Sequence, residues 1–220
     1  MQFKIKENLI RIREEIAPYT PNIIAVTKYF DEIAIEEAYE AGLRDFGESR
    51  VIEAIEKIQK LPIEIQNNSK FHFIGHLQTN KVRKAVEHFD VIHSVDTLKV
   101  AEKISESATE IGKIQNIFLQ LNNAGEVQKS GFSKEELFSA FEKISVLPNI
   151  KILGLMNMAP LGASENLLRE LFHGVCTTRD ELEGKFGYKL PEISMGMSQD
   201  YVIAAQEGAT MLRIGRKLFS

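Results

Sequence analysis

Lys28 directly follows the apolar run at residues 23–27, and a primary amine in that position can react with a carbonyl group. Consecutive aliphatic residues are typical of a strand that is buried on both faces in a parallel sheet. In α/β barrels, active-site groups emerge at the carboxyl ends of such strands. Most lysines are solvated surface charges, so Lys28 alone does not define a site. Its chemistry depends on the residues that follow the other strands.

Two glycine-containing segments late in the chain have the residues of a phosphate-binding site. The first, residues 194–198, ends at Ser198 and leads into a predicted helix, where a hydroxyl and backbone N–H groups can bind an anion. The second contains Gly215 and Arg216, whose backbone amides could bind the same phosphate. Glycine and serine are also ordinary turn and cap residues. Their placement after two late strands of one barrel, where phosphates often bind, favours the phosphate interpretation.

Arg213 lies near the end of an apolar strand and, by strand alternation, points away from the side of Leu212 and Ile214. A guanidinium inside a barrel is costly unless it meets an acceptor, which is either an internal carboxylate or a ligand. An amine, a phosphate site and an arginine together match pyridoxal 5′-phosphate, which carries an aldehyde, a phosphate and a pyridine nitrogen. A barrel enzyme acting on another phosphorylated metabolite would explain the phosphate site but not Lys28.

The elements that must position these residues alternate along the chain. Apolar runs separated by amphipathic stretches predict eight short strands, most of them followed by a helix, and a charged amphipathic helix precedes the first strand. The predicted strands are residues 22–27, 44–46, 71–74, 91–94, 116–121, 150–156, 192–194 and 210–214. They predict an α/β fold with one domain over residues 1–220, a single (β/α)8 TIM barrel with an extra N-terminal helix. An open doubly wound sheet is the alternative topology.

Composition favours a soluble, cytoplasmic protein. The 220 residues are 44% hydrophobic, with 27 basic and 31 acidic residues and a net charge of −4, which does not favour binding to nucleic acid. The single cysteine, Cys176, excludes an internal disulfide and fits a reducing compartment. We expect no membrane segment, because no apolar run approaches the roughly 18 residues that a spanning helix needs. We also expect no metal site, because a strand end separates His72 from His76.

Seven segments, in order over nearly the whole chain, match one known family. They are residues 25–28 (AVTK), 45–48 (DFGE), 72–81 (HFIGHLQTNK), 92–96 (IHSVD), 154–156 (GLM), 194–200 (SMGMSQD) and 213–215 (RIG). They resemble the corresponding segments of the pyridoxal phosphate homeostasis proteins, a family similar to the amino-terminal barrel of alanine racemase. The segments at 72–81 and 194–200 are long enough to make the resemblance specific.

The resemblance implies a monomeric or weakly associating barrel that holds pyridoxal 5′-phosphate as a Schiff base on Lys28. It implies that Ser198 and the amides of Gly215 and Arg216 bind the phosphate, and that Arg213 faces the pyridine nitrogen. It also implies cofactor contacts from five further residues, which are Ser49, His76, Met156, Ser194 and Met197. Members of the family are proposed to buffer pyridoxal phosphate and other B6 vitamers and to deliver the cofactor to dependent apoenzymes, without an established catalytic activity.

Three residues depart from the family pattern: Ser49 replaces the usual asparagine, Asn157 a frequent threonine, and Arg216 a small residue. Ser49 lacks an amide donor, whereas a backbone amide at position 216 does not depend on the side chain. We also expect no counterpart of the second domain that supplies a catalytic tyrosine to alanine racemase, because the sequence ends at Leu218, Phe219 and Ser220. We therefore expect a protein that holds the cofactor, and the alternative is a pyridoxal-phosphate enzyme with weak racemase-type activity on amino acids.

Overall fold

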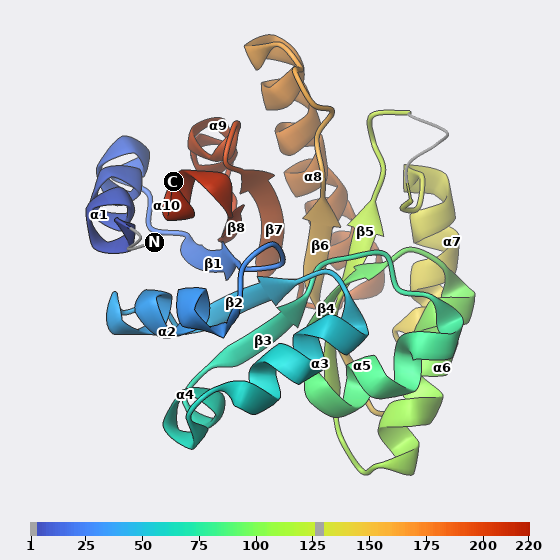
Figure 1. Cartoon of the computed structure of the whole chain (residues 1–220). Coiled ribbons are helices and arrows are strands. Elements are labelled where there is room, and N and C mark those ends of the chain that lie inside the picture. The colour runs from blue at the N-terminus through green and yellow to red at the C-terminus, as the bar shows by residue number, and fades with distance from the viewer. Residues whose placement is uncertain (1–3, 126–129) are drawn as a thin grey trace.

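The computed structural model describes residues 4–125 and 130–220, in which eight parallel strands close into a barrel with helices around its outside (Figure 1). The strands are β1 (Asn22–Val26), β2 (Asp45–Glu48), β3 (Lys70–Phe73), β4 (Val91–Val95), β5 (Gln115–Leu121), β6 (Ile150–Asn157), β7 (Glu192–Met197) and β8 (Met211–Ile214). Each strand pairs with the next, and β8 pairs with β1 through partners such as Arg213 and Ile24. The (β/α)8 barrel is therefore confirmed, and the open doubly wound alternative is wrong.

Helices follow most of the strands and precede the first one. They are α1 (Ile5–Ile16), α2 (Glu32–Glu40), α3 (Val51–Lys60), α4 (Ile63–Asn67), the 3-10 turn η1 (Thr79–Lys81), α5 (Val82–His88), α6 (Leu98–Glu110), α7 (Lys134–Ile144), α8 (Glu165–Phe186), α9 (Tyr201–Gln206) and α10 (Arg216–Phe219). Helices α4 and α10 are not predicted by the sequence pattern, because elements of four or five residues are too short to show a helical period. None of the helices in the described ranges is long and apolar enough to cross a lipid bilayer.

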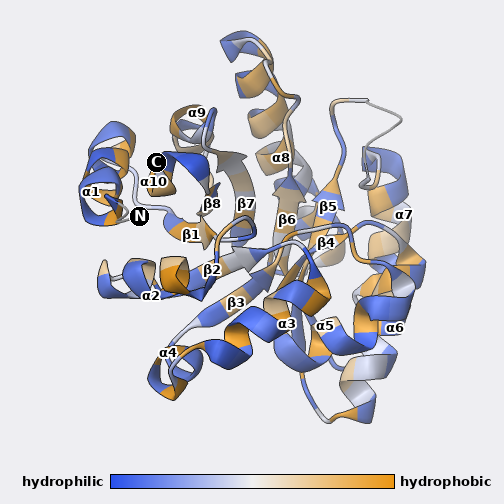
Figure 2. Cartoon of the chain, viewed as in Figure 1, coloured by the Kyte–Doolittle hydropathy of each residue, from blue (hydrophilic) through white to orange (hydrophobic). Residues whose placement is uncertain are grey.

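Helix α1 is the extra N-terminal helix, and it packs against the carboxyl-terminal segment (Figure 1). Its apolar face is buried through Ile5, Leu9, Ile12 and Ile16. The side-chain amide of Asn8 donates to the backbone oxygens of Leu218, at 3.0 Å, and Ser220, at 2.7 Å. Figure 2 shows hydrophobic residues interspersed with hydrophilic ones along the strands and on the surrounding helices, and the buried hydrophobic residues come from both. The core therefore fills both the barrel and the layer between strands and helices.

Strand β7 extends three residues past its predicted end at Ser194. The register between β7 and β8 shifts between Ser194 and Met197, and Gly196 within this shift has a φ of +90°. A Cβ at Gly196 would lie 2.5 Å from the Cβ of Ala204, in a backbone conformation that other residues rarely adopt. The expected loop at residues 194–198 is thus mostly a bulged strand end, because the irregularity depends on pairing with β8 and not on local sequence.

Gly154 in β6 lies so close to β7 that we expect Gly154→Ala to lower the free energy of unfolding by about 2 kcal/mol. A Cβ there would lie 1.6 Å from the backbone oxygen of Glu192, its partner in β7, so the strands would have to separate locally. Gly184 on α8 is the matched control, because it is exposed and a Cβ there meets nothing within 4 Å. Gly184→Ala should stabilise the protein by about 0.5–1 kcal/mol. Urea denaturation followed by circular dichroism measures both changes, and equal effects would contradict this packing argument.

Candidate functional site

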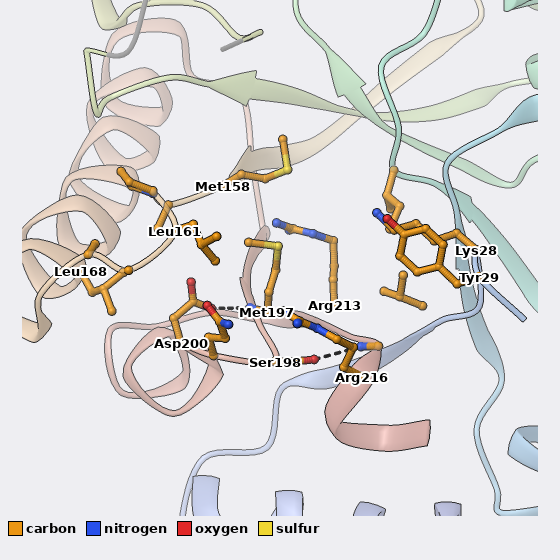
Figure 3. Close-up of a pocket in the computed structure, with 18 of the residues that line it drawn as sticks. Lys28, Tyr29, Met158, Leu161, Leu168, Met197, Ser198, Asp200, Arg213 and Arg216 are labelled. Carbon is orange, nitrogen blue, oxygen red and sulfur yellow. Dashed lines mark hydrogen bonds between the residues drawn. The ribbon is translucent and has the colours of Figure 1, made fainter. Parts of the chain in front are cut away.

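One cavity at the carboxyl ends of the strands contains six of the ten predicted site residues. Its volume is about 570 Å³, and its lining includes Lys28, Met197, Ser198, Arg213, Gly215 and Arg216. Figure 3 shows Lys28 and Tyr29 at one end and Leu161 and Leu168 at the other, with Arg213 between them. Charged and polar groups from three distant segments thus converge beside an apolar wall, a combination that is typical of small-molecule sites.

A buried ion pair holds the backbone that leads into Lys28. The Lys57 Nζ on α3 donates to Oε1 of Glu48, at 2.6 Å, and to the carbonyl oxygen of Thr27, at 2.9 Å. The Thr27 hydroxyl donates to the same carboxylate oxygen at 2.7 Å. The side chains of Glu48 and Lys57 are only 3% and 11% exposed. These contacts fix the residue before Lys28, while the half-buried Lys28 places its Nζ 5.0 Å from the ring centroid of Tyr29.

Ser198 and the start of α10 lie together at the end of the cavity where the sequence predicts anion binding. The Ser198 hydroxyl oxygen accepts the backbone N–H groups of Gly215 and Lys217, both at 3.3 Å. Both hydrogen bonds are long, and an anion placed beside Ser198 would be a stronger acceptor for the same amides. Arg216 adds a guanidinium group to this part of the cavity lining. The arrangement is suited to a phosphate monoester.

Arg213 is almost completely buried, and two hydrogen bonds hold its guanidinium. It donates to the hydroxyl of Ser194 and to the backbone oxygen of Asn157, both at 2.7 Å. Burial lowers the pKa of Arg213 to about 10. The negative charge of nearby Asp200 raises this pKa but offsets only part of the decrease. The guanidinium therefore stays protonated at neutral pH. Because both anchors are neutral oxygen atoms, the positive charge is available to a ligand in the cavity.

Asp200 lines the cavity, although it is not among the cofactor contacts that the sequence predicts. Its carboxylate accepts the backbone N–H of Met197 at 2.5 Å, which ties together the bend that carries Ser198. Burial raises the pKa of Asp200, and the Met197 hydrogen bond and the charge of Arg213 partly offset this increase. An aspartate just before a predicted helix indicates a hydrogen-bond acceptor for backbone N–H groups. Only the folded structure shows that the N–H of Met197 is its partner.

The other four predicted site residues lie outside this cavity. Ser49 and His76 line a separate pocket of about 210 Å³, where Nδ1 of His76 is 3.2 Å from the carboxylate of Asp96. Met156 is fully buried and packs with an apolar cluster. Ser194 is also fully buried, and it reaches the cavity through its hydrogen bond with Arg213.

An apolar wall is the largest part of the cavity that sequence reasoning missed. It comes from the loop between β6 and α8, at residues 158–163, together with Leu168, Tyr29 and Phe30. A loop has no periodic pattern, so its contribution to a distant site leaves no signal in the sequence. Within residues 4–125 and 130–220, no group of three or more histidine, cysteine or acidic side chains lies together as a metal site would require.

Comparisons with known proteins identify the family. The chain matches the model of the alanine racemase N-terminal domain over residues 3–220. It is 42% identical to the pyridoxal phosphate homeostasis protein of Synechocystis over 208 residues, which are 94% of this chain and 94% of that protein. The chain belongs to the pyridoxal phosphate homeostasis protein family. The resemblance of the seven sequence segments is thereby confirmed.

Solved structures agree with membership of the pyridoxal phosphate homeostasis family. A structure of PipY from Synechococcus elongatus with pyridoxal phosphate bound has a TM-score of 0.89 at 40% identity, covering 99% of this chain and 100% of that chain. PipY without pyridoxal phosphate has a TM-score of 0.93. Alanine racemase of Clostridium difficile has a TM-score of 0.81 at 15% identity, and this chain covers 56% of it, so that likeness concerns the fold alone.

Proposed function

We propose that this protein binds pyridoxal 5′-phosphate, attaches it reversibly to Lys28 as a Schiff base, and holds it for vitamin B6 homeostasis without efficient catalysis. The observation that carries the proposal is that Lys28, Ser198, Gly215 and Arg213 line one cavity. Two findings on relatives support it. The Synechocystis relative is named a pyridoxal phosphate homeostasis protein, and PipY, at 40% identity, has a structure with pyridoxal phosphate bound.

The residues of the cavity fit the three functional parts of pyridoxal phosphate. The amine of Lys28 suits its aldehyde, and the hydroxyl of Ser198 with the amides of Gly215 and Arg216 suits its phosphate. The charged Arg213 suits its pyridine nitrogen, which is a hydrogen-bond acceptor. When bound, the cofactor supplies a reactive aldehyde and an electron-withdrawing ring.

Lys28 provides the covalent link. Its amine nitrogen adds to the aldehyde carbon, and the aldehyde oxygen leaves as water, so that a carbon–nitrogen double bond remains. Attack by water or by another amine reverses the link, which allows release to other B6 vitamer pools and to dependent apoenzymes. The Glu48–Lys57 pair supports this step by fixing the backbone at Thr27.

Two features of the cavity favour holding the cofactor over turnover. Arg213 is a protonated donor, so a ring nitrogen facing it accepts a hydrogen bond, remains unprotonated and is a weaker electron sink. Racemisation also needs an acid or base on each face of the substrate carbon. A tyrosine could supply the second acid or base, and among the described residues that line the cavity Tyr29 is the one tyrosine. It is 78% exposed and lies beside Lys28 rather than opposite it. Both properties are those of a carrier, and the family resemblance implies that the carrier is a monomer.

The full-length chain, freed of ligand and incubated with pyridoxal phosphate, tests this function. We expect an absorption band at about 420 nm and, after borohydride reduction, one pyridoxyl phosphate group mapped by mass spectrometry to Lys28. Pyridoxal should bind at least about tenfold more weakly, because it leaves the phosphate site unfilled. A protein that stays colourless and unmodified would overturn the proposed function. Sustained α-deuterium incorporation with inversion of L-alanine in deuterated water would instead support a racemase.

A further inference from the structure

A continuous line of hydrogen bonds crosses the barrel interior from Asp45, at the start of β2, to Arg213 in β8. Oδ1 of Asp45 lies 2.8 Å from Nε2 of His72, and Nδ1 of His72 lies 2.8 Å from Nε2 of His93. Nδ1 of His93 lies 2.9 Å from the hydroxyl of Ser194, to which Arg213 donates at 2.7 Å. The line passes through five strands and crosses the barrel between β4 and β7, which are not neighbours in the sheet.

All members of this line are buried except Asp45, which is partly exposed. His72, His93, Ser194 and Arg213 are each at most 3% exposed, whereas the Asp45 side chain is 16% exposed. The ring of His93 also stacks on Phe118, with centroids 4.4 Å apart. Hydrogen bonds are strong in such a dry interior, and a group left without its partner there is costly. The line is therefore a defined part of the structure.

The two ends determine the direction of donation. A guanidinium can only donate, and an ionised carboxylate can only accept. If His72 is neutral, its Nε2–H donates to Asp45, so its Nδ1 must accept from Nε2–H of His93. Nδ1 of His93 then accepts from the Ser194 hydroxyl, which accepts in turn from Arg213. Every group donates towards Asp45, and both imidazole rings carry their hydrogen on Nε2.

Neutral His72 is the state that satisfies every member of the line. A protonated His72 would donate to His93 and move the His93 hydrogen to Nδ1. Ser194, which is fully buried, would then receive hydrogens from both His93 and Arg213 and would need a new acceptor for its own hydroxyl hydrogen. Asp45 is also held ionised: burial raises its pKa, but hydrogen bonds from His72 and Asn22, the charge that His72 carries when it is protonated and the charge of Lys70 leave the pKa below its usual value.

We propose that Asp45, His72, His93 and Ser194 are positioning residues that form a one-way hydrogen-bond chain and hold the charged Arg213 in the orientation that it presents to the ligand. The identity of the ligand rests on the proposed function, whereas the existence of the hydrogen-bond chain is inferred from the hydrogen bonds alone. Because Ser194 offers its lone pair to one side of the guanidinium, the other N–H groups of Arg213 are left for Asn157 and for the cavity.

The position of Asp45 makes this proposal testable at a distance. Asp45 does not line the cavity that contains Arg213, but lines a separate cleft with residues such as Arg13 and Arg44. A substitution of Asp45 therefore has no direct contact with a ligand in the cavity. Any change that it causes in ligand binding has to pass through the barrel interior.

Nuclear magnetic resonance of the full chain, labelled with ¹⁵N in histidine and free of ligand, tests the direction of the chain. Long-range correlation between ring protons and nitrogens reports which nitrogen carries the hydrogen. We expect His72 and His93 to be neutral with the hydrogen on Nε2 at neutral pH, with signals assigned by their loss in His72→Gln and His93→Phe. A charged His72, or a hydrogen on Nδ1 of His93, would overturn the proposed direction.

Affinity for pyridoxal phosphate, measured by its absorption band in the same full-length protein, tests the coupling to Arg213. Asp45→Leu removes the terminal acceptor and should weaken binding about tenfold, the effect of about one lost hydrogen bond. Asp45→Asn keeps an acceptor oxygen and should restore affinity to within about twofold. Ser105→Ala is the matched control, because it removes a buried hydroxyl that donates to the backbone oxygen of Pro148 and takes no part in the hydrogen-bond chain.

The outcomes separate this proposal from the proposed function. Equal affinities in all three variants and the unaltered protein would show that the chain does not reach the ligand, and would overturn the coupling. Equal loss in Asp45→Leu and Asp45→Asn would also overturn it, because hydrogen-bond acceptance would then be irrelevant. If the unaltered protein does not bind pyridoxal phosphate, the proposed function fails and the role towards this ligand fails with it, whereas the histidine tautomers still decide the direction of the chain.

Discussion

Lys28→Ala is expected to abolish covalent retention of pyridoxal phosphate. The alanine side chain has no nitrogen to form the double bond with the aldehyde, so neither the absorption band nor the mass increase after borohydride reduction should appear. The phosphate site at Ser198 and the guanidinium of Arg213 remain, so weak non-covalent binding should persist. We expect affinity to fall by about two orders of magnitude, or about 2.7 kcal/mol, measured by equilibrium dialysis against pyridoxal phosphate.

Lys84→Ala is the matched control for this prediction. Lys84 is an exposed lysine on α5 and does not line the cavity, so its loss should leave the band, the mass increase and the affinity unchanged. Circular dichroism checks that both variants keep the barrel. A full band in Lys28→Ala, or a pyridoxyl group mapped to another lysine with the affinity of the unaltered protein, would show that Lys28 is not the attachment site.

Most of the fold could be predicted because its signals are local. The apolar run at residues 23–26 and its counterparts in later strands indicate buried parallel strands, and their regular alternation with helices predicts a barrel. The bulge around Gly196 could not be predicted, because it results from the register between β7 and β8. Helices α4 and α10 were missed because they are shorter than the window that a helical period requires.

The candidate site could be predicted only where position along a strand is informative. Lys28, Ser198 and Arg213 stand at or beyond strand ends, so the topology brings them to one mouth of the barrel. Ser49 and His76 also follow strands, but the structure places them in a neighbouring pocket. The direction in which a loop leaves its strand decides this placement, and the sequence does not report that direction.

The supports of the site could not be predicted, because each is a contact between side chains far apart in the chain. Glu48 and Lys57 come from a strand and a helix, and only the fold shows that they meet beneath Thr27. The contact between His93 and Ser194 joins positions 101 residues apart. Residue types alone indicate that these groups need partners, but many residues in the chain could supply them.

Lys57→Met is expected to lower the free energy of unfolding by about 3–5 kcal/mol, the usual effect of leaving one charge of a buried pair without its partner. Methionine has a similar length and fills the space of the lysine stem, so the main loss is the ammonium that neutralises Glu48. That carboxylate is 3% exposed and would keep the hydrogen bond from the Thr27 hydroxyl without a compensating charge. Urea denaturation measures the change. Lys103→Met, which removes an exposed partner of Glu106, is the control and should have little effect.

The double variant Glu48→Gln with Lys57→Met separates the cost of the unpaired charge from the cost of the lost hydrogen bond to the Thr27 carbonyl. Glutamine is neutral and nearly isosteric with glutamate, and its amide oxygen can still accept the Thr27 hydroxyl. If the buried charge is the main penalty, the double variant should regain at least about half of the stability lost in Lys57→Met, because no charge is left without a partner. If its loss equals that of Lys57→Met or exceeds it, the ammonium acts mainly through its hydrogen bond to the Thr27 carbonyl. In that case the pair serves to hold the backbone before Lys28 rather than to balance a charge.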